Sequence, residues 1–158
     1  MYTIGIDLGG TNIVASVVDD EYKIIGTSKT PTNAPRSAHE IFDDIAEVCE
    51  EAVKAADLTM ADIDSVGMGT PGTVNQDGII EFANNLAFNN VPARTMLAKR
   101  LNKPEEKIYI ENDANCAALG EAYAGVGNGA KDFVAVTLGT GVGSGVIIDG
   151  KIVNGVNY

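Results

Sequence analysis

The chain has 158 residues, with 22 Asp and Glu against 11 Lys and Arg, which gives a formal net charge of −11. Surfaces that bind nucleic acid or anionic membranes need clustered Lys and Arg, so this balance argues against both partners. Hydrophobic residues make up 45% and charged residues 21%, as in an ordinary folded domain, whereas the 18 glycines are unusual because most lie inside apolar segments.

The sequence contains no segment that is typical of a membrane span or an export signal. The most apolar stretch, residues 133–148, is interrupted by four glycines and does not reach the ~20 apolar residues that a spanning helix needs. No basic segment followed by an apolar one opens the chain, so we expect a cytoplasmic protein. Cys49 and Cys116 lie far apart, without the spacing of a metal or redox motif, and we expect both to be thiols.

The first expected element is a β-hairpin. Residues 2–8 and 12–18 are rich in β-branched side chains and are separated by Gly9-Gly10, which predicts two strands joined by a glycine turn. A third strand is expected near residues 23–26.

A helix is expected next, over residues 38–56. Ser37 and Glu40 have the spacing of a capping box, and the apolar residues behind them recur at helical intervals. Cys49 lies on the apolar side of this helix, which predicts a small core residue and not a reactive thiol.

The middle of the chain contains several shorter elements. In chain order we expect a strand that ends at Gly69, a hairpin near 78–80, loops over 81–90, a helix over 92–101, a strand over 107–110 and a helix over 114–124. The glycine-rich segment 125–129 is expected to link two domains, 1–128 and 129–158.

The order of elements repeats within the chain. Residues 4–9 and 17–19 resemble residues 134–139 and 147–149, and each copy reads as strand, glycine turn, strand and acidic turn. Two hairpins can share composition by chance, but the shared order favours a duplication and predicts two similar lobes that face one another.

The turn after the first strand has two interpretations. The backbone amides of Gly9 and Gly10, with Thr11 and Asn12 as further donors, could cradle a phosphate, and Asp7 could hold a divalent cation directly or through water. The alternative is a tight hairpin whose turn is capped by Asp7. The segment has no Gly-Lys-Ser/Thr and is therefore not a Walker loop.

The second glycine turn contains Gly139, Thr140 and Gly141. A strand and not a helix follows it, which argues against a Rossmann dinucleotide loop. It is either a twisted hairpin with glycine bulges or, together with the first turn, one side of a clamp on a polyphosphate.

Asp113 follows a predicted strand and begins a predicted helix. It could be a general base that accepts a hydroxyl proton, with Asn112 bound to the same substrate, or it could cap the helix. Phosphoryl transfer needs little more than an oriented hydroxyl, a base, a metal and a phosphate cradle.

Two polar loops could bind a polyhydroxylated ligand, because each asparagine amide both donates and accepts hydrogen bonds. They contain Gly72 with Thr73, and Asn84 with Asn85. The alternative is a set of ordinary asparagine-rich turns.

Four motifs, taken in order, resemble those of the sugar kinases in the repressor/open-reading-frame/kinase (ROK) family, within the actin-like ATPase superfamily. They are Asp7-Leu8-Gly9-Gly10-Thr11-Asn12, Gly69-Thr70-Pro71-Gly72, Glu111-Asn112-Asp113-Ala114-Asn115 and Leu138-Gly139-Thr140-Gly141-Val142-Gly143. The resemblance implies an α/β fold, an actin-like ATPase (ribonuclease H-like) lobe with a mixed sheet flanked by helices. It also implies an ATP-dependent, glucokinase-like hexose kinase.

The resemblance also implies roles for individual residues. Asp113 would be the catalytic base for a hexose hydroxyl, and Asp7 would lie near Mg²⁺. The sugar pocket would be lined by Gly72, Thr73, Asn84, Asn85 and Asn112. The ATP phosphates would be cradled by Gly9, Gly10, Thr11 and Asn12 and by Gly139, Thr140 and Gly141.

Members of this family are longer than the present chain. Beyond the second turn they carry a Glu-x-Gly-His sugar-binding motif, a cysteine cluster for structural Zn²⁺ and an adenine pocket, none of which occurs here. We therefore expect the first lobe and the opening hairpin of a second lobe, inactive alone, with zinc only in the missing part.

The resemblance leaves the substrate and some partners open. Glucose is the expected hexose, although relatives phosphorylate N-acetylated hexoses, fructose or allose, and a homodimer is expected. The alternative is a non-catalytic regulatory domain that binds sugar or nucleotide. A DNA-binding repressor is disfavoured, because the first strand begins at residue 2 and leaves no room for a preceding helix-turn-helix.

Overall fold

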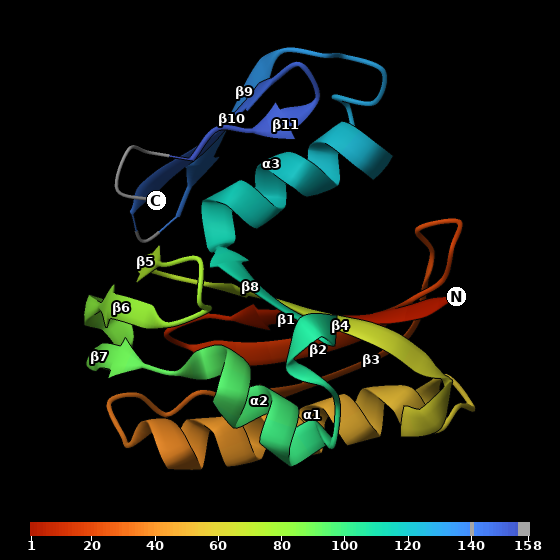
Figure 1. Ribbon diagram of the computed structural model, residues 1–158, viewed down its shortest axis with the longest axis vertical. Helices are drawn as coiled ribbons and strands as arrows, with labels where there is room; N and C mark the ends of the chain where they lie inside the picture. The colour runs from red at the N-terminus through yellow and green to blue at the C-terminus, as the bar shows by residue number, and fades with distance from the viewer. Residues whose placement is uncertain (140, 155–158) are drawn as a thin grey trace. The chain divides into compact units, whose positions relative to one another are not determined.

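The computed structural model describes residues 1–139 and 141–154. It divides into two compact units, Met1–Glu111 and Asn112–Tyr158, whose elements are labelled in Figure 1. No helix in the described ranges is both long enough and apolar enough to cross a bilayer.

The first unit is built on a five-stranded mixed sheet with the strand order β3-β2-β1-β4-β8. β1 is antiparallel to β2 and parallel to β4. The strands are β1 (Tyr2–Leu8), β2 (Asn12–Val18), β3 (Ile24–Pro31), β4 (Ile63–Thr70) and β8 (Ile108–Asn112). The predicted hairpin is confirmed. The third strand is longer than expected, and as an edge strand it tolerates Pro31 at its end.

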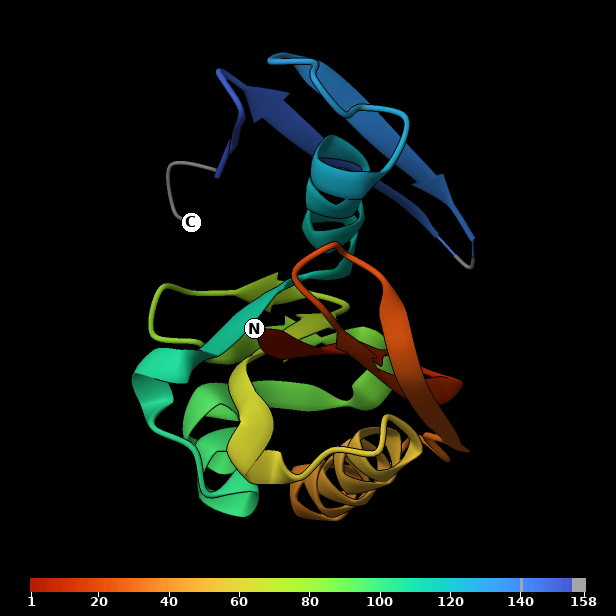
Figure 2. The ribbon, with the colours of Figure 1, turned by 90° about the vertical axis from the view of Figure 1, so that its right-hand side faces the viewer.

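Helices α1 (Ala38–Ala55) and α2 (Ala93–Leu101) lie on the same side of this sheet, as Figure 1 and Figure 2 show. Alternation along β1 turns Ile4, Ile6 and Leu8 into the core and leaves Asp7 exposed on the opposite face. The helix approaches the sheet closely at one glycine: a Cβ on Gly26 would lie 2.4 Å from the carbonyl oxygen of Ala52. Both predicted helices are therefore confirmed, and they cover one face of the sheet.

The N-terminus of α1 is held by the predicted capping box. The Ser37 hydroxyl donates to the Glu40 carboxylate (2.6 Å), the Ser37 amide donates to it as well (3.1 Å), and the Glu40 amide donates back to Ser37 Oγ (3.3 Å). Cys49 is buried in the stripe that α1 presents to the core, and burial raises the pKa of its thiol to about 12. The expectation that Cys49 is a core residue is thus confirmed, and a buried thiol with a raised pKa is typical of an unreactive cysteine.

Replacing Ser37 by Ala should destabilise the chain in a pH-dependent way. The hydrogen bonds from Ser37 lower the pKa of Glu40, so this stabilisation is present above the unfolded-state pKa and is lost as the pH falls through the folded-state pKa. We expect Ser37→Ala to lower the Tm by about 2–4 °C at pH 7 and by clearly less at pH 3. Thermal melts followed by circular dichroism test this, with the exposed Ser144→Ala as the control. A Tm difference that is the same at both pH values would contradict it.

Residues 73–91 form a small antiparallel sheet, where the sequence predicted a hairpin at 78–80 and then loops. Its strands are β5 (Thr73–Val74), β6 (Ile80–Ala83) and β7 (Phe88–Val91), with the 3₁₀ turn η2 (Asn84–Leu86) between the last two. The prediction of loops over 81–90 was wrong. In both β6 and β7 only the first and last residues are buried, so the alternation that identifies a strand is missing.

Two further 3₁₀ turns precede the strands of the main sheet. They are η1 (Met60–Asp62) before β4 and η3 (Glu105–Lys107) before β8.

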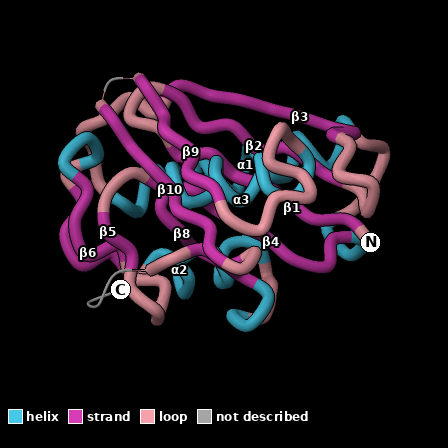
Figure 3. Tube along the Cα trace, turned by 90° about the horizontal axis from the view of Figure 1, so that it is seen from above, coloured by secondary structure: helices cyan, strands magenta, loops and turns pink. Residues whose placement is uncertain are grey.

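The second unit consists of α3 (Asp113–Ala124) and the strands β9 (Phe133–Leu138), β10 (Val142–Ile148) and β11 (Lys151–Ile152). Figure 3 shows β9 and β10 running side by side. α3 packs closely on this hairpin, since a Cβ on Gly145 would lie 2.4 Å from the Cβ of Ala118. Small residues on both elements are therefore required for the contact.

The order of elements expected from the internal repeat is confirmed. β1-β2-β3 and β9-β10-β11 are both antiparallel and run in chain order across their sheets. In each set of three strands, a glycine amide closes the turn between the first two strands. Gly9 donates to the Asn12 carbonyl and Gly139 donates to the Gly141 carbonyl, both at 2.9 Å. The closing hydrogen bond of the later turn spans one residue fewer than that of the earlier turn.

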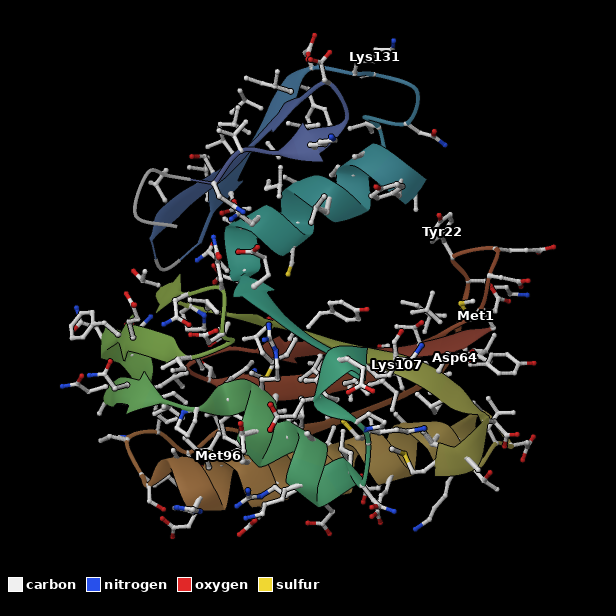
Figure 4. The ribbon with its side chains drawn as sticks, in the orientation of Figure 1. Met1, Tyr22, Asp64, Met96, Lys107 and Lys131 are labelled. Carbon is white, nitrogen blue, oxygen red and sulfur yellow. The ribbon has the colours of Figure 1, made fainter. Side chains whose placement is uncertain are left out.

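The segment 125–129 is a compact turn at the end of α3. The amides of Gly125 and Gly127 both donate to the carbonyl of Glu121 (3.2 and 3.0 Å), and Figure 4 shows Lys131 in the loop that leads on to β9. Because α3 packs with the hairpin, the compact units divide before α3. The division of the whole protein into lobes at residues 128 and 129 stays a prediction.

Candidate functional site

The predicted residues of the first unit lie at one edge of the main sheet. β1 and β4 are parallel neighbours, and Asp7 is in register with Gly69. The chain therefore leaves β1 through Gly9 and leaves β4 through Gly72 at the same edge. In sheets with parallel strands, ligands bind at this carboxyl edge.

The first glycine turn presents unpaired backbone donors. The Gly9 amide is used inside the turn, where it donates to the Asn12 carbonyl. Within the described part of the chain, the amides of Gly10 and Thr11 donate no hydrogen bond, and the Thr11 side chain is exposed. Two neighbouring amides without partners suit an anion. These two residues are only part of the set that the sequence predicted to bind phosphate.

Asp7 suits a metal that is bound mainly by phosphate. It is exposed at the end of β1, next to the glycine turn. No group of three or more His, Cys, Asp or Glu side chains in residues 1–139 and 141–154 could hold a metal ion. Mg²⁺ that bridges phosphates needs only one or two protein carboxylates and keeps several waters, so Asp7 fits that limited role.

The two predicted sugar loops meet near this turn. Gly72 has a φ of +96°, and a Cβ there would lie 2.0 Å from the carbonyl oxygen of Phe82, so its loop rests directly on the end of β6. A Cβ on Gly10 would lie 3.2 Å from the Cβ of Asn85, which places the η2 turn against the glycine turn. Thr73 is exposed and pairs with Phe82. The first unit thus brings together the predicted phosphate turn and the two loops, Gly72 with Thr73 and Asn84 with Asn85, that are predicted to bind sugar.

Asn112, and not Asp113, caps α3. Its Oδ1 accepts hydrogen bonds from the amides of Ala114 (2.9 Å) and Asn115 (3.3 Å). Asp113 is the first helical residue, is exposed, and accepts from the Ala114 amide at 2.8 Å. The helix N-terminus stabilises its negative charge. The capping alternative for Asp113 is therefore wrong.

The second glycine turn lies at the same end of the second unit as the start of α3. A Cβ on Gly143 would lie 2.9 Å from the Cβ of Ala114, so the beginning of β10 packs on the first turn of the helix. In contrast, a Cβ on Gly139 or Gly141 would meet nothing within 4 Å. These two glycines border open space, as a ligand-binding turn requires. Thr140 lies outside the described residues.

One residue that the sequence did not indicate holds the first turn. Thr32 is fully buried, its Oγ1 donates to the Gly9 carbonyl (2.6 Å), and its amide donates to the Thr11 carbonyl (2.8 Å). A lone threonine after Pro31 carries no periodic signal, so only the fold reveals it.

Three features define the class of protein. They are the mixed sheet covered by helices, the glycine turn at the carboxyl edge of that sheet, and a second antiparallel hairpin with a glycine turn. The chain has the actin-like ATPase fold. It resembles the crystal structure of a ROK family glucokinase from Streptomyces griseus in complex with glucose and AMPPNP, with a TM-score of 0.87 and 38% identity over 98% of this chain and 47% of that one.

The ROK family profile matches residues 3–157, and the chain belongs to the ROK family. It is 40% identical to a glucokinase of Streptomyces coelicolor over 154 residues, 97% of this chain and 45% of the relative. It is 34% identical to a xylose repressor of Caldicellulosiruptor bescii over 160 residues, 96% of this chain and 38% of the repressor. The chain thus spans about half or less of the length of these relatives.

Proposed function

We propose that this chain forms the first lobe and the opening hairpin of the second lobe of an ATP-dependent, glucokinase-like hexose kinase. The observation that carries the proposal is the pair of unpaired amides at Gly10 and Thr11, in a turn that contacts Asn85. An anion cradle beside exposed amide side chains suits a phosphate donor and a polyhydroxylated acceptor. The similarity to glucokinases along nearly the whole chain supports the same function.

In the proposed reaction, Asp113 accepts the proton of a sugar hydroxyl while that oxygen attacks the γ-phosphorus of ATP and ADP leaves. Asp7 would hold Mg²⁺ directly or through water, and the metal would neutralise phosphate charge when bound. The sugar is held by Gly72, Thr73, Asn84, Asn85 and Asn112. The phosphates are held by Gly9, Gly10, Thr11 and Asn12 and by Gly139, Thr140 and Gly141.

The whole protein would act on glucose in the cytoplasm as a homodimer, with structural Zn²⁺ only in its C-terminal part. A coupled assay of ADP release with several hexoses tests the activity on the full-length protein. We expect turnover to be fastest with glucose, and negligible turnover for the 158-residue chain alone, because closure of two lobes is needed to exclude water. Absence of turnover by the full-length protein with every hexose would contradict the proposal, and rapid turnover by the short chain would contradict the need for both lobes.

A second candidate function is sugar or nucleotide binding for regulation, without catalysis. The 34% identity to a xylose repressor favours it. Titration of the full-length protein with glucose or xylose in the absence of ATP detects binding alone. Sugar binding without ADP release would favour the regulator over the kinase.

A further inference from the structure

Thr32 bonds to two carbonyls of the first glycine turn. Its hydroxyl donates to Gly9 and its amide to Thr11, and its side chain has no solvent exposure. It directly follows β3, so these two bonds fasten the β1–β2 turn to the end of the neighbouring strand.

These bonds fix the direction of two amides in the turn. The carbonyl of Gly9 and the N–H of Gly10 belong to one planar trans peptide, in which they point in opposite directions. The same holds for the Thr11 carbonyl and the Asn12 N–H. Because both carbonyls are drawn toward Thr32, the amides of Gly10 and Asn12 are directed away from it.

Thr32 is itself held in place from α1. The Arg36 Nε donates to the Thr32 carbonyl at 2.8 Å, and the Arg36 guanidinium forms an ion pair with Asp44 of α1. The hydroxyl, amide and carbonyl of Thr32 are therefore all engaged, and the turn is connected to a helix that packs on the main sheet.

We propose that Thr32 is the positioning residue of this turn, aiming the Gly10 amide at a phosphate group. The inference rests on the proposed function, since it assumes that the turn binds phosphate. The amide of Gly10 has no partner among the described residues, and a fixed donor binds an anion more tightly than a mobile one.

The test uses the 158-residue chain and inorganic tripolyphosphate with Mg²⁺, followed by ¹⁵N NMR. Thr32→Val keeps the shape and the amide but removes the hydroxyl, and Thr32→Ser retains the hydroxyl. As a control, Thr27→Val removes an exposed hydroxyl of β3 that lies 3.0 Å from the Ser16 hydroxyl of β2. Residual dipolar couplings report the direction of the Gly10 N–H without ligand, and the Gly10 shift during titration reports the Kd.

We expect Thr32→Val to turn the Gly10 N–H and to weaken binding about tenfold, while Thr32→Ser and Thr27→Val behave as the wild type. An unchanged N–H direction in a folded Thr32→Val, or a changed direction with an unchanged Kd, would overturn the positioning role and leave the kinase proposal standing. If the wild type bound tripolyphosphate without any shift at Gly10, the same inference would fail. If the wild type bound no tripolyphosphate, the phosphate site of the proposed function would fail with it.

Discussion

Asp113→Asn in the full-length protein is expected to lower kcat by about 10²–10⁴-fold while the fold stays intact. Asparagine keeps the shape of the side chain and can still accept the Ala114 amide bond at the helix N-terminus, but it cannot take up a proton. The residue is exposed and Asn112 provides the cap, so the structure gives Asp113 no role in the core that the substitution would disturb.

Two further variants are compared with Asp113→Asn. Asn112→Ala removes the cap of α3 and should lower the free energy of unfolding by about 1 kcal/mol. Asp132→Asn alters another exposed carboxylate of the same unit and should leave kcat unchanged. Steady-state kinetics with saturating glucose and ATP, together with urea unfolding of each variant, provide the measurements. Near-normal kcat in a folded Asp113→Asn would remove Asp113 from the role of base.

Local patterns were sufficient to predict most of the fold. α1 was predictable because the capping box of Ser37 and Glu40 and the apolar period behind it are both short-range features. The β1–β2 hairpin was predictable because its β-branched strands flank a glycine pair. The same reasoning predicted α2 over residues 92–101, and the helix ends at Asn102, which adopts a left-handed φ of 50°.

Features that depend on distant contacts were not predictable. β6 and β7 bury only their terminal residues, so their strands are recognised by mutual pairing and not by alternation. Thr32 acquires its function only when β3 ends beside the β1–β2 turn. α3 was correctly expected as a helix, but its packing on β9 and β10 was not, because the glycine-rich segment 125–129 has the composition of a linker.

The glycines of the β9–β10 hairpin show the same limit of prediction from sequence. Gly139 and Gly141 border open space, whereas Gly143 and Gly145 would clash with α3 if they carried a Cβ. In sequence these four residues form one alternating pattern. Only the structure separates glycines that could approach a ligand from glycines that let a helix approach a strand.

Gly72→Ala is expected to lower the free energy of unfolding of the chain by about 3 kcal/mol or more. Two costs add at this position. The φ of +96° is rarely adopted by residues with a Cβ, and the new Cβ would lie 2.0 Å from the Phe82 carbonyl oxygen and 2.9 Å from the Cα of Ala83. Both neighbours are backbone atoms, so the clash cannot be relieved by a change of rotamer.

Two glycine controls resolve these costs in urea unfolding followed by circular dichroism. Gly129 has a φ of +86° and Gly67 has no positive φ, and a Cβ on either would meet nothing within 4 Å. Gly129→Ala should therefore show the backbone cost alone, about 1–2 kcal/mol, and Gly67→Ala should change stability by about 0.5 kcal/mol or less. If Gly72→Ala cost no more than Gly129→Ala, the loop after β4 would not rest on β6. The predicted sugar residues Gly72 and Asn84 would then lose the contact that brings their loops together.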